Sequence, residues 1–248
     1  MNALVLAAGL GTRLRPFTLH HPKALVPVDG VPMLRIVIES LISQGFDRVV
    51  VNVHHFADQI VGYLAVSDFG VPVFVSDESG QLLDTGGGIV KAASLFGDSE
   101  EPVLVHNVDI LSNANLSVLY SSHKESGAGA TLLCSTRSSS RKLLTEEDGR
   151  LAGWKNVNTG ELRPRGLSVE EAARLNEVSF SGIYVVGRSE IEKMREWAKS
   201  PAFPVMDYFL DNLHTSRFIC RCDTELRVMD IGKPETLSLA SGFRTSLK

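Results

Sequence analysis

The sequence predicts an α/β fold: a mostly parallel sheet with helices on both of its faces. In the first 110 residues, continuous apolar runs typical of buried strands alternate with segments of helical spacing. Strands that alternate with helices form βαβ units, whose right-handed crossovers place helices on both faces of the sheet. The length of 248 residues, with 44% hydrophobic and 22% charged side chains, suits one large domain with a sizeable core. We therefore expect a single domain over residues 1–248.

The first half of the chain carries the clearest element signals. Residues 3–8 are a continuous apolar run, as expected for a strand buried on both faces. Residues 33–44 place apolar side chains at positions 34, 37, 38, 41 and 42, which is helical spacing, and Gly45 is a suitable stop. By the same criteria, the expected strands are residues 3–8, 48–53, 71–75 and 103–105, and the expected helices are residues 33–44, 56–64 and 88–95.

The second half is less regular, and its elements alternate less clearly. The polar stretch 138–142 is interpreted as a solvated loop, with a loop that closes over a product as the alternative. Trp154 fits either a sugar-stacking position or a half-buried core position. The expected strands are residues 128–135, 151–154, 180–186, 218–222 and 226–229, and the expected helices are residues 190–199, 205–213 and 234–241.

Charge and cysteine content limit the classes of partner and compartment. The chain has 25 basic and 29 acidic residues, a net charge of −4, which argues against nucleic acid or a membrane surface as the main partner. It has no run of about 18 apolar residues that could span a bilayer, and its first residues lack a basic leader. Three cysteines without a pairing pattern favour a reducing compartment. We therefore expect a cytoplasmic protein.

The strongest chemical signal is a glycine loop that follows the first predicted strand. Gly9 and Gly11 let the backbone approach a ligand closely and present N–H groups to an anion. Arg13, Arg15 and Lys23 follow, so positive charge gathers here in an otherwise acidic protein. The loop is neither a dinucleotide fingerprint, which needs a third glycine at position 14, nor a Walker loop, which needs Gly-Lys-Ser/Thr. This pattern predicts a triphosphate site.

Two aspartates offer ligands for a divalent cation. Asp109 ends a predicted strand at Asn107-Val108-Asp109, where the carboxyl ends of parallel strands form a ligand crevice. Asp230 follows a short apolar run and precedes Gly232 and Pro234. Two converging carboxylates suit Mg²⁺ that also holds phosphate oxygens.

A run of three glycines marks a further candidate segment. Residues 84–88 read Asp-Thr-Gly-Gly-Gly and precede an apolar helix. Glycines there would let a planar ring lie against the backbone and let backbone groups read its hydrogen-bonding edge. The alternative interpretation is a flexible loop.

Together these motifs resemble the signature of the sugar-1-phosphate nucleotidylyltransferases. The resemblance rests on LAAGLGTRLRP at residues 6–16 with Pro-Lys at 22–23, on Asn-Val-Asp at 107–109, and on MDIGKP at 229–234. The last two match family patterns with changes: Val108 replaces a glycine, and the Trp and Thr positions of the third motif differ. The run Asp-Thr-Gly-Gly-Gly-Ile most resembles the Glu-Thr-Gly-Gly-Gly-Ile of N-acetylmuramic acid 1-phosphate uridylyltransferases.

The resemblance implies a fold, a reaction and a set of site residues. It implies a Rossmann-like fold of the nucleotide-diphospho-sugar transferase type, with a nucleotide-binding half at about 1–110 and a sugar-binding half with closing strands at about 111–248. In the implied reaction, a sugar 1-phosphate attacks the α-phosphorus of an NTP and pyrophosphate leaves. UTP is the NTP that we expect to be preferred. The implied catalytic residues are Arg13, Lys23 and Asp109, and the implied Mg²⁺ ligands are Asp109 and Asp230. The implied nucleotide contacts are Ala8, Gly9, Gly11, Thr12, Arg13, Lys23, Gly86, Gly87 and Asn107, and the implied sugar contacts are Asn176, Glu177 and Gly182.

Other functions remain open at this point. One alternative is a guanylyl- or cytidylyltransferase acting on a heptose or hexose 1-phosphate or on phosphocholine. A non-catalytic nucleotide-sensing homologue is disfavoured because all four charged residues, Arg13, Lys23, Asp109 and Asp230, are present. A hydride-transferring oxidoreductase is disfavoured because the third glycine of the dinucleotide loop is missing.

Overall fold

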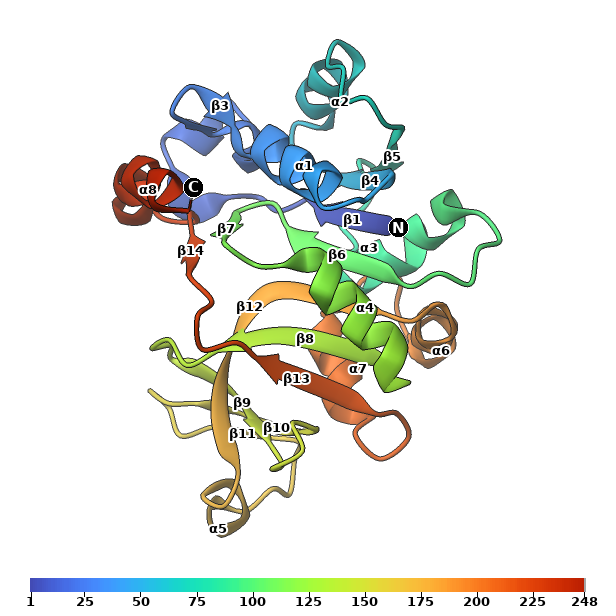
Figure 1. Ribbon diagram of the computed structural model, residues 1–248, viewed down its shortest axis with the longest axis vertical. Helices are drawn as coiled ribbons and strands as arrows, with labels where there is room; N and C mark the ends of the chain where they lie inside the picture. The colour runs from blue at the N-terminus through green and yellow to red at the C-terminus, as the bar shows by residue number, and fades with distance from the viewer. Residues whose placement is uncertain (248) are drawn as a thin grey trace.

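A ten-stranded mixed sheet forms the centre of the protein in a computed structural model that describes residues 1–247 (Figure 1). Its first half is entirely parallel: β1 pairs with β4 and β6, and β4 pairs with β5. These strands are β1 (Asn2–Leu6), β4 (Arg48–Val53), β5 (Val73–Asp77) and β6 (Val103–Asn107). The expected α/β fold with a mostly parallel sheet is therefore confirmed.

The second half of the sheet is built around one long strand, β12 (Asn176–Val186). It runs antiparallel to β6 and β8, and β13 then pairs with β8 in parallel. A register shift between Phe180 and Tyr184, with Gly182 at φ 80°, separates the two ends of β12, and its first residues pair with β9 instead. The partner strands are β8 (Ala130–Ser135), β9 (Arg141–Thr145), β10 (Leu151–Asn156), β11 (Leu162–Arg163) and β13 (Phe218–Cys222).

Helices cover both faces of the sheet because alternate strand residues point to opposite sides. Ala3 and Val5 of β1 pack into one apolar cluster with α1, α2 and α4, whereas Leu4 packs into a second cluster with α3, α6 and α7. The helices are α1 (Met33–Ser43), α2 (Ala57–Ala65), α3 (Asp84–Ala92), α4 (Leu116–Ser126), α6 (Arg188–Trp197) and α7 (Val205–Asp211). Two packed layers of helix around one sheet account for the observed core.

A third, smaller cluster ties the end of the chain to its first residues. Helix α8 (Pro234–Ser246) packs Ala240 into a cluster with Val28 and Met33, the first residue of α1, and Figure 1 shows it as the red helix beside the blue segments. The remaining elements are β2 (Pro27–Val28), β3 (Val31–Pro32), β7 (Ile110–Ser112), β14 (Val228–Asp230) and α5 (Val169–Ala172). Four 3₁₀ turns are η1 (Thr12–Leu14), η2 (Phe17–Leu19), η3 (Lys23–Leu25) and η4 (Ala93–Phe96).

The expected elements differ from the structure at two places. The helix expected at residues 88–95 begins earlier, at Asp84, so the glycine run 84–88 forms the first turns of α3. Helix α4 was not expected, although Asn115 caps it by accepting a hydrogen bond from the Val118 amide at 3.0 Å and Gly127 ends it in a left-handed conformation. Serine and charged residues separate the buried side chains of α4, so its apolar face is short and gives a weak helical pattern in the sequence.

The structure also bears on membrane insertion. Over residues 1–247, every helix is too short or too polar to cross a bilayer.

Candidate active site

The loop after β1 folds tightly around Gly11. This residue has φ 62°, and a Cβ atom there would lie 2.9 Å from the Thr18 side chain and 3.0 Å from Lys23. The Gly11 carbonyl accepts hydrogen bonds from the Thr18 hydroxyl at 2.8 Å and from the Leu14 amide at 2.9 Å. Gly11 thus fixes the turn that brings η1 and Lys23 together, and only glycine fits it.

A first cavity of about 330 Å³ opens at the carboxyl ends of β1, β4 and β6. This is the edge of a parallel sheet where ligands bind in open α/β folds. It contains five of the predicted site residues. Its lining residues are Leu6, Ala7, Ala8, Gly9, Lys23, Asn52, Leu82, Asp84, Thr85, Asn107, Val108 and Asp109. Nothing lies within 4 Å of a Cβ atom built on Gly9, so the backbone is open to a ligand there.

Lys23 and Asp109 form an ion pair at the end of this cavity. The Lys23 ammonium donates a hydrogen bond to Asp109 Oδ2, and both side chains are only 12–13% exposed. Burial raises the pKa of Asp109 above its usual value, the Lys23 charge opposes this rise, and the nearby Asp230 carboxylate adds to it. The carboxylate is therefore held in a site that favours an additional positive charge.

Asp230 reaches the same place from the far end of the chain. Strand β14 pairs antiparallel with β7, with Asp230 opposite Ile110, and the Ile231 amide donates to the Asp109 carbonyl at 2.9 Å. Arg13 Nη2 lies 3.6 Å from Asp230 Oδ2. A Cβ atom on Gly232 would lie 2.5 Å from that guanidinium, so a glycine is needed for this approach. The two predicted carboxylates are thus brought together, with Arg13 beside them.

The residues present fit a Mg²⁺ ion that is shared with phosphate groups. Asp109 and Asp230 supply hard oxygen donors, and the Asp230 carboxylate lies near enough to Asp109 to add to the rise in its pKa, which burial causes first. Within residues 1–247, no group of three or more His, Cys, Asp or Glu side chains is arranged for a metal. Mg²⁺ needs no such cage, because it is bound through one or two carboxylates plus waters and substrate phosphates.

A second cavity of about 390 Å³ adjoins the first, and Thr85 and Asn107 line both. Asp230 also lines this second cavity. A Cβ atom on Gly182 would lie 2.8 Å from Asn107 Nδ2, so the glycine in the bend of β12 leaves room for that side chain. The other lining residues are Ile110, Arg137, Ser139, Arg141, Leu143, Trp154, Phe180, Ser181, Gly182, Tyr184, Pro204, Val205 and Met206.

The second cavity contains one of the three predicted sugar residues. Gly182 lines it, whereas Asn176 and Glu177 are exposed at the start of β12, away from its lining, where Glu177 pairs with Lys155 at 2.7 Å. Sequence reasoning missed Arg137 and Arg141, because their stretch looked like a solvated loop. Trp154 lines this cavity, consistent with the stacking alternative considered for it.

The glycines of α3 have a packing role that the sequence did not reveal. A Cβ atom built on Gly86 would lie 2.2 Å from the Phe203 ring, and one built on Gly87 would lie 2.0 Å from the Pro201 carbonyl oxygen. Both backbone amides donate to the Phe203 carbonyl, at 2.9 and 3.4 Å. These amides are therefore not free to read a base edge, and Asp84 and Thr85 line the first cavity instead. Gly11, Thr12 and Arg13 also lie outside its lining, in the turn beside it.

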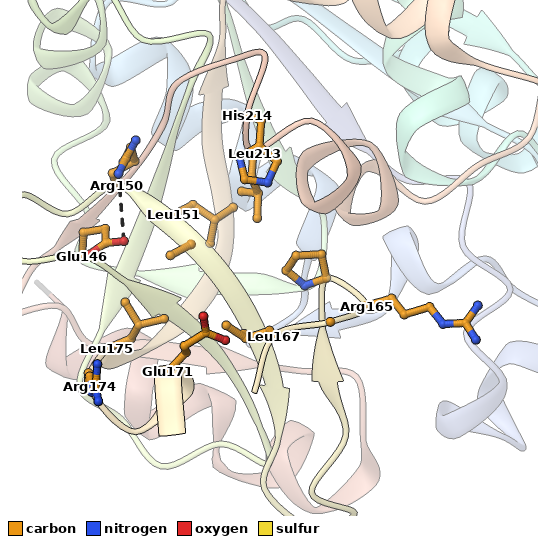
Figure 2. Close-up of a pocket in the computed structure, with 13 residues that line it drawn as sticks. Glu146, Arg150, Leu151, Arg165, Leu167, Glu171, Arg174, Leu175, Leu213 and His214 are labelled. Atoms are coloured by element: carbon orange, nitrogen blue, oxygen red, sulfur yellow. Dashed lines mark ion pairs between the residues drawn. The ribbon is translucent and has the colours of Figure 1, made fainter. Parts of the chain in front are cut away.

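A third cavity of about 600 Å³ lies in the β9–β10–β11 region and shares no lining residue with the other two (Figure 2). Leu151, Leu167 and Leu213 form part of its wall, and the Arg165 guanidinium points away from it. Glu146 pairs with Arg150 at 3.9 Å, and Glu171 accepts the hydrogen bonds that cap α5. None of the predicted phosphate or metal residues lines this cavity.

Comparisons with known proteins agree with this geometry. Residues 2–142 match the family model of the nucleotidyl transferases. An N-acetylmuramate alpha-1-phosphate uridylyltransferase of Caulobacter vibrioides is 44% identical over 110 residues, which cover 43% of this chain and 45% of the relative. A UTP–glucose-1-phosphate uridylyltransferase of Synechocystis sp. is 32% identical over 199 residues, covering 75% of this chain and 48% of the relative. The chain thus spans less than half the length of these two curated relatives.

Solved structures share the fold along nearly the whole chain. HddC from Yersinia pseudotuberculosis has a TM-score of 0.76 and 23% identity, covering 98% of this chain and 99% of that chain. A putative glucose-1-phosphate thymidylyltransferase from Bacillus anthracis has a TM-score of 0.80 and 16% identity, covering 98% and 94%. Because the family model spans more than half of the 248 residues, the chain belongs to the nucleotidyl transferase family.

Proposed function

We propose that the protein transfers a nucleotidyl group from an NTP to a sugar 1-phosphate, giving an NDP-sugar and pyrophosphate. The observation that carries this proposal is the pairing of the two cavities: they share Thr85 and Asn107, with Asp109 in the first and Asp230 in the second. A reaction between two phosphorylated substrates needs a place where both can be held together and where positive charge offsets that of the phosphates. Lys23, Arg13 and a cation held by the two carboxylates would supply that charge.

The chemistry asks little of the protein beyond alignment and charge neutralisation. An oxygen of the acceptor phosphate forms a bond to the α-phosphorus, and the bond from that phosphorus to the β-bridging oxygen breaks. Pyrophosphate leaves with the electron pair of that bond. The acceptor phosphate is already ionised at neutral pH, so no general base is needed. In-line transfer of this type is driven mainly by positioning and electrostatic stabilisation.

Each charged residue has a proposed part in this step. Lys23 would neutralise charge near the reacting phosphorus, since its ammonium lies at the end of the first cavity. Arg13 would bind the β- and γ-phosphates, because a guanidinium can hold phosphate oxygens in a bidentate manner. Asp109 and Asp230 would hold Mg²⁺, which when bound supplies positive charge between the phosphate groups of both substrates.

The second cavity is proposed to bind the acceptor. Trp154, Phe180 and Tyr184 give it aromatic walls suited to a sugar ring, and Arg137 and Arg141 supply positive charge for the acceptor phosphate. Phosphocholine stays an alternative acceptor, because aromatic side chains also bind a quaternary ammonium and the two arginines would serve its phosphate equally.

UTP is the favoured nucleotide. This choice is supported by the two relatives from Caulobacter and Synechocystis, both of which are named uridylyltransferases. A competing guanylyl alternative is kept because a mannose-1-phosphate guanylyltransferase subunit of Drosophila pseudoobscura pseudoobscura is 34% identical over 153 residues.

The test is pyrophosphate release from each of UTP, CTP, GTP and dTTP, combined with several sugar 1-phosphates and with phosphocholine. We expect release only when Mg²⁺ and an acceptor are both present, with UTP preferred. Dominant GDP-sugar formation would move the protein to the guanylyl branch. Nucleotide binding with no turnover for any pair would favour the nucleotide-sensing alternative.

A further inference from the structure

The two walls of the nucleotide cavity are joined by a buried polar chain. One wall is the loop after β1, with Ala7 and Ala8. The other runs from the end of β5 to the first residue of α3, with Leu82 and Asp84. Between them lies Asn52, at the end of β4, which is 2% exposed and lines the cavity itself. Behind Asn52 lies Glu78, which is fully buried.

Four hydrogen bonds run through this pair. Asn52 Oδ1 accepts from the Ala7 amide at 2.6 Å and from the Ala8 amide at 3.2 Å. Asn52 Nδ2 donates to Glu78 Oε1 at 2.8 Å, and Glu78 Oε2 accepts from the Leu83 amide at 3.1 Å. The chain of contacts therefore begins on one wall of the cavity and ends on the other.

The carboxylate decides how the amide is oriented. Two N–H donors on one side of Asn52 require its oxygen, and a carboxylate on the other side requires its NH₂ group. Only one orientation meets both requirements, so Glu78 keeps Asn52 Oδ1 pointed at Ala7 and Ala8. Gly88 leaves space for this arrangement, because a Cβ atom there would lie 2.9 Å from both Asn52 Nδ2 and Glu78 Oε1.

We infer that Asn52 and Glu78 are positioning residues that hold the two walls of the nucleotide cavity in register for NTP binding. This inference rests on the proposed function, because it concerns the same cavity. Neither residue needs to touch the reacting phosphorus, which the proposal places beside Lys23 and Asp109. Loss of the pair should therefore weaken NTP binding and leave the chemical step largely intact.

Exchanging the two functional groups gives a sharp test. In Asn52→Asp, a second carboxylate faces Glu78, and the two acceptors repel each other. In Glu78→Gln, the NH₂ group of the new amide faces either the Asn52 NH₂ group or the Leu83 N–H. Two donors then face each other, so one hydrogen bond is lost. In the double variant, the introduced carboxylate accepts from Ala7, Ala8 and the new amide, whose oxygen accepts from Leu83. All four hydrogen bonds are then restored, with the same net charge.

We expect each single variant to raise the KM for NTP by about tenfold, the effect of one buried hydrogen bond, with kcat changed by less than about threefold. The KM for the sugar phosphate should not change. The double variant should return the KM for NTP to within about threefold of wild type. Tyr208→Phe is the matched control: it removes a buried hydrogen bond to Glu190, outside all three cavities, and should leave the KM for NTP unchanged.

A second readout does not depend on turnover. Amide hydrogen exchange of Ala7 and Ala8 in the free protein should accelerate in both single variants and regain protection in the double variant. Unchanged exchange and unchanged KM in the single variants would overturn the inference, and so would a double variant no better than either single one. Absence of turnover in the wild type would contradict the proposed function instead, and the exchange measurement would still decide the role of the pair.

Discussion

At the scale of single residues, the site depends on charges that neutralise each other only in part. Asp109 is buried beside Lys23, and burial raises its pKa. The negative charge of Asp230 raises this pKa further, and the Lys23 charge opposes the rise. Breaking a buried ion pair leaves an uncompensated charge, which is costly. Substitutions here therefore affect both stability and chemistry, and the two effects must be measured separately.

The carboxylates are the first residues to test. Asp109→Asn and Asp230→Asn each remove one negative charge from the proposed Mg²⁺ site while keeping the side-chain shape. Each should lower turnover by about two orders of magnitude or more. The measurement is pyrophosphate release in a Mg²⁺ titration, with the melting temperature as a control for folding. Wild-type rates at saturating Mg²⁺ would rule out the metal assignment.

The two cations should differ in their kinetic effects. Lys23→Ala should lower kcat more than it raises the KM for NTP, since Lys23 is assigned to the reacting phosphorus. Arg13→Ala should weaken triphosphate binding as well as turnover, and Arg13→Lys should rescue it only in part, because an ammonium cannot make bidentate phosphate contacts. If Lys23→Ala changed only the KM for NTP, Lys23 would be a binding residue.

At the scale of elements, the glycine run of α3 is explained by packing. Gly86→Ala and Gly87→Ala each add a methyl group where the 201–203 segment already fills the space, at 2.2 Å from the Phe203 ring and 2.0 Å from the Pro201 carbonyl. Each should lower the free energy of unfolding by about 1–3 kcal/mol. Gly62→Ala is the control, because that helical glycine has nothing within 4 Å of its Cβ position, and it should stabilise α2 slightly. Denaturant unfolding measures all three, and equal stability of the α3 variants would contradict this explanation.

The same helix shows what the sequence could and could not predict. Continuous apolar runs identified the parallel strands because burial on both faces leaves little choice of residue. The packing role of the α3 glycines could not be predicted, since the reason for their small size is a contact with residues more than 110 positions later. Asn52 and Glu78 could not be predicted for a related reason. A single polar residue at a strand end has no local signature, and the partners of Asn52 come from two other segments, at residues 7–8 and at residue 78.

The candidate site follows the same division. Lys23, Asp109 and Gly9 could be predicted because contiguous motifs carry them, and the structure brings them to one cavity. The second cavity could be predicted only in part. Trp154 and Gly182 were candidates, but Arg137 and Arg141 have no motif around them, and they reach the cavity because β9 pairs with the first residues of β12.

At the scale of the whole molecule, two buried histidines link stability to pH. Burial lowers the pKa of His106 and of His123 to about 4, against an ordinary value of 6.5. Between these values the unfolded chain binds more protons than the folded one, so this stability is present above pH 6.5 and is lost as pH falls toward 4. Each histidine should lower the free energy of unfolding by about 2 kcal/mol between pH 7 and pH 5.

The comparison uses one variant to isolate this contribution. His123→Gln can keep a hydrogen bond to the Thr131 hydroxyl, which lies 3.0 Å from His123 Nδ1, but cannot titrate. Denaturant unfolding at pH 7, 6 and 5 should show a smaller loss for the variant than for the wild type. Parallel pH profiles would show that His123 does not titrate differently in the folded and unfolded states.

The central claim is that two adjoining cavities let one phosphate ester attack another across the Asp109–Asp230 junction. The most direct measurement is simultaneous quantification of pyrophosphate and NDP-sugar, with and without the acceptor, for the wild type and Asp109→Asn. The predicted result is equal amounts of both products, formed only with Mg²⁺ and a sugar 1-phosphate, and an equal fall in both for the variant. Pyrophosphate release without an acceptor, or wild-type product formation by the variant, would contradict the account.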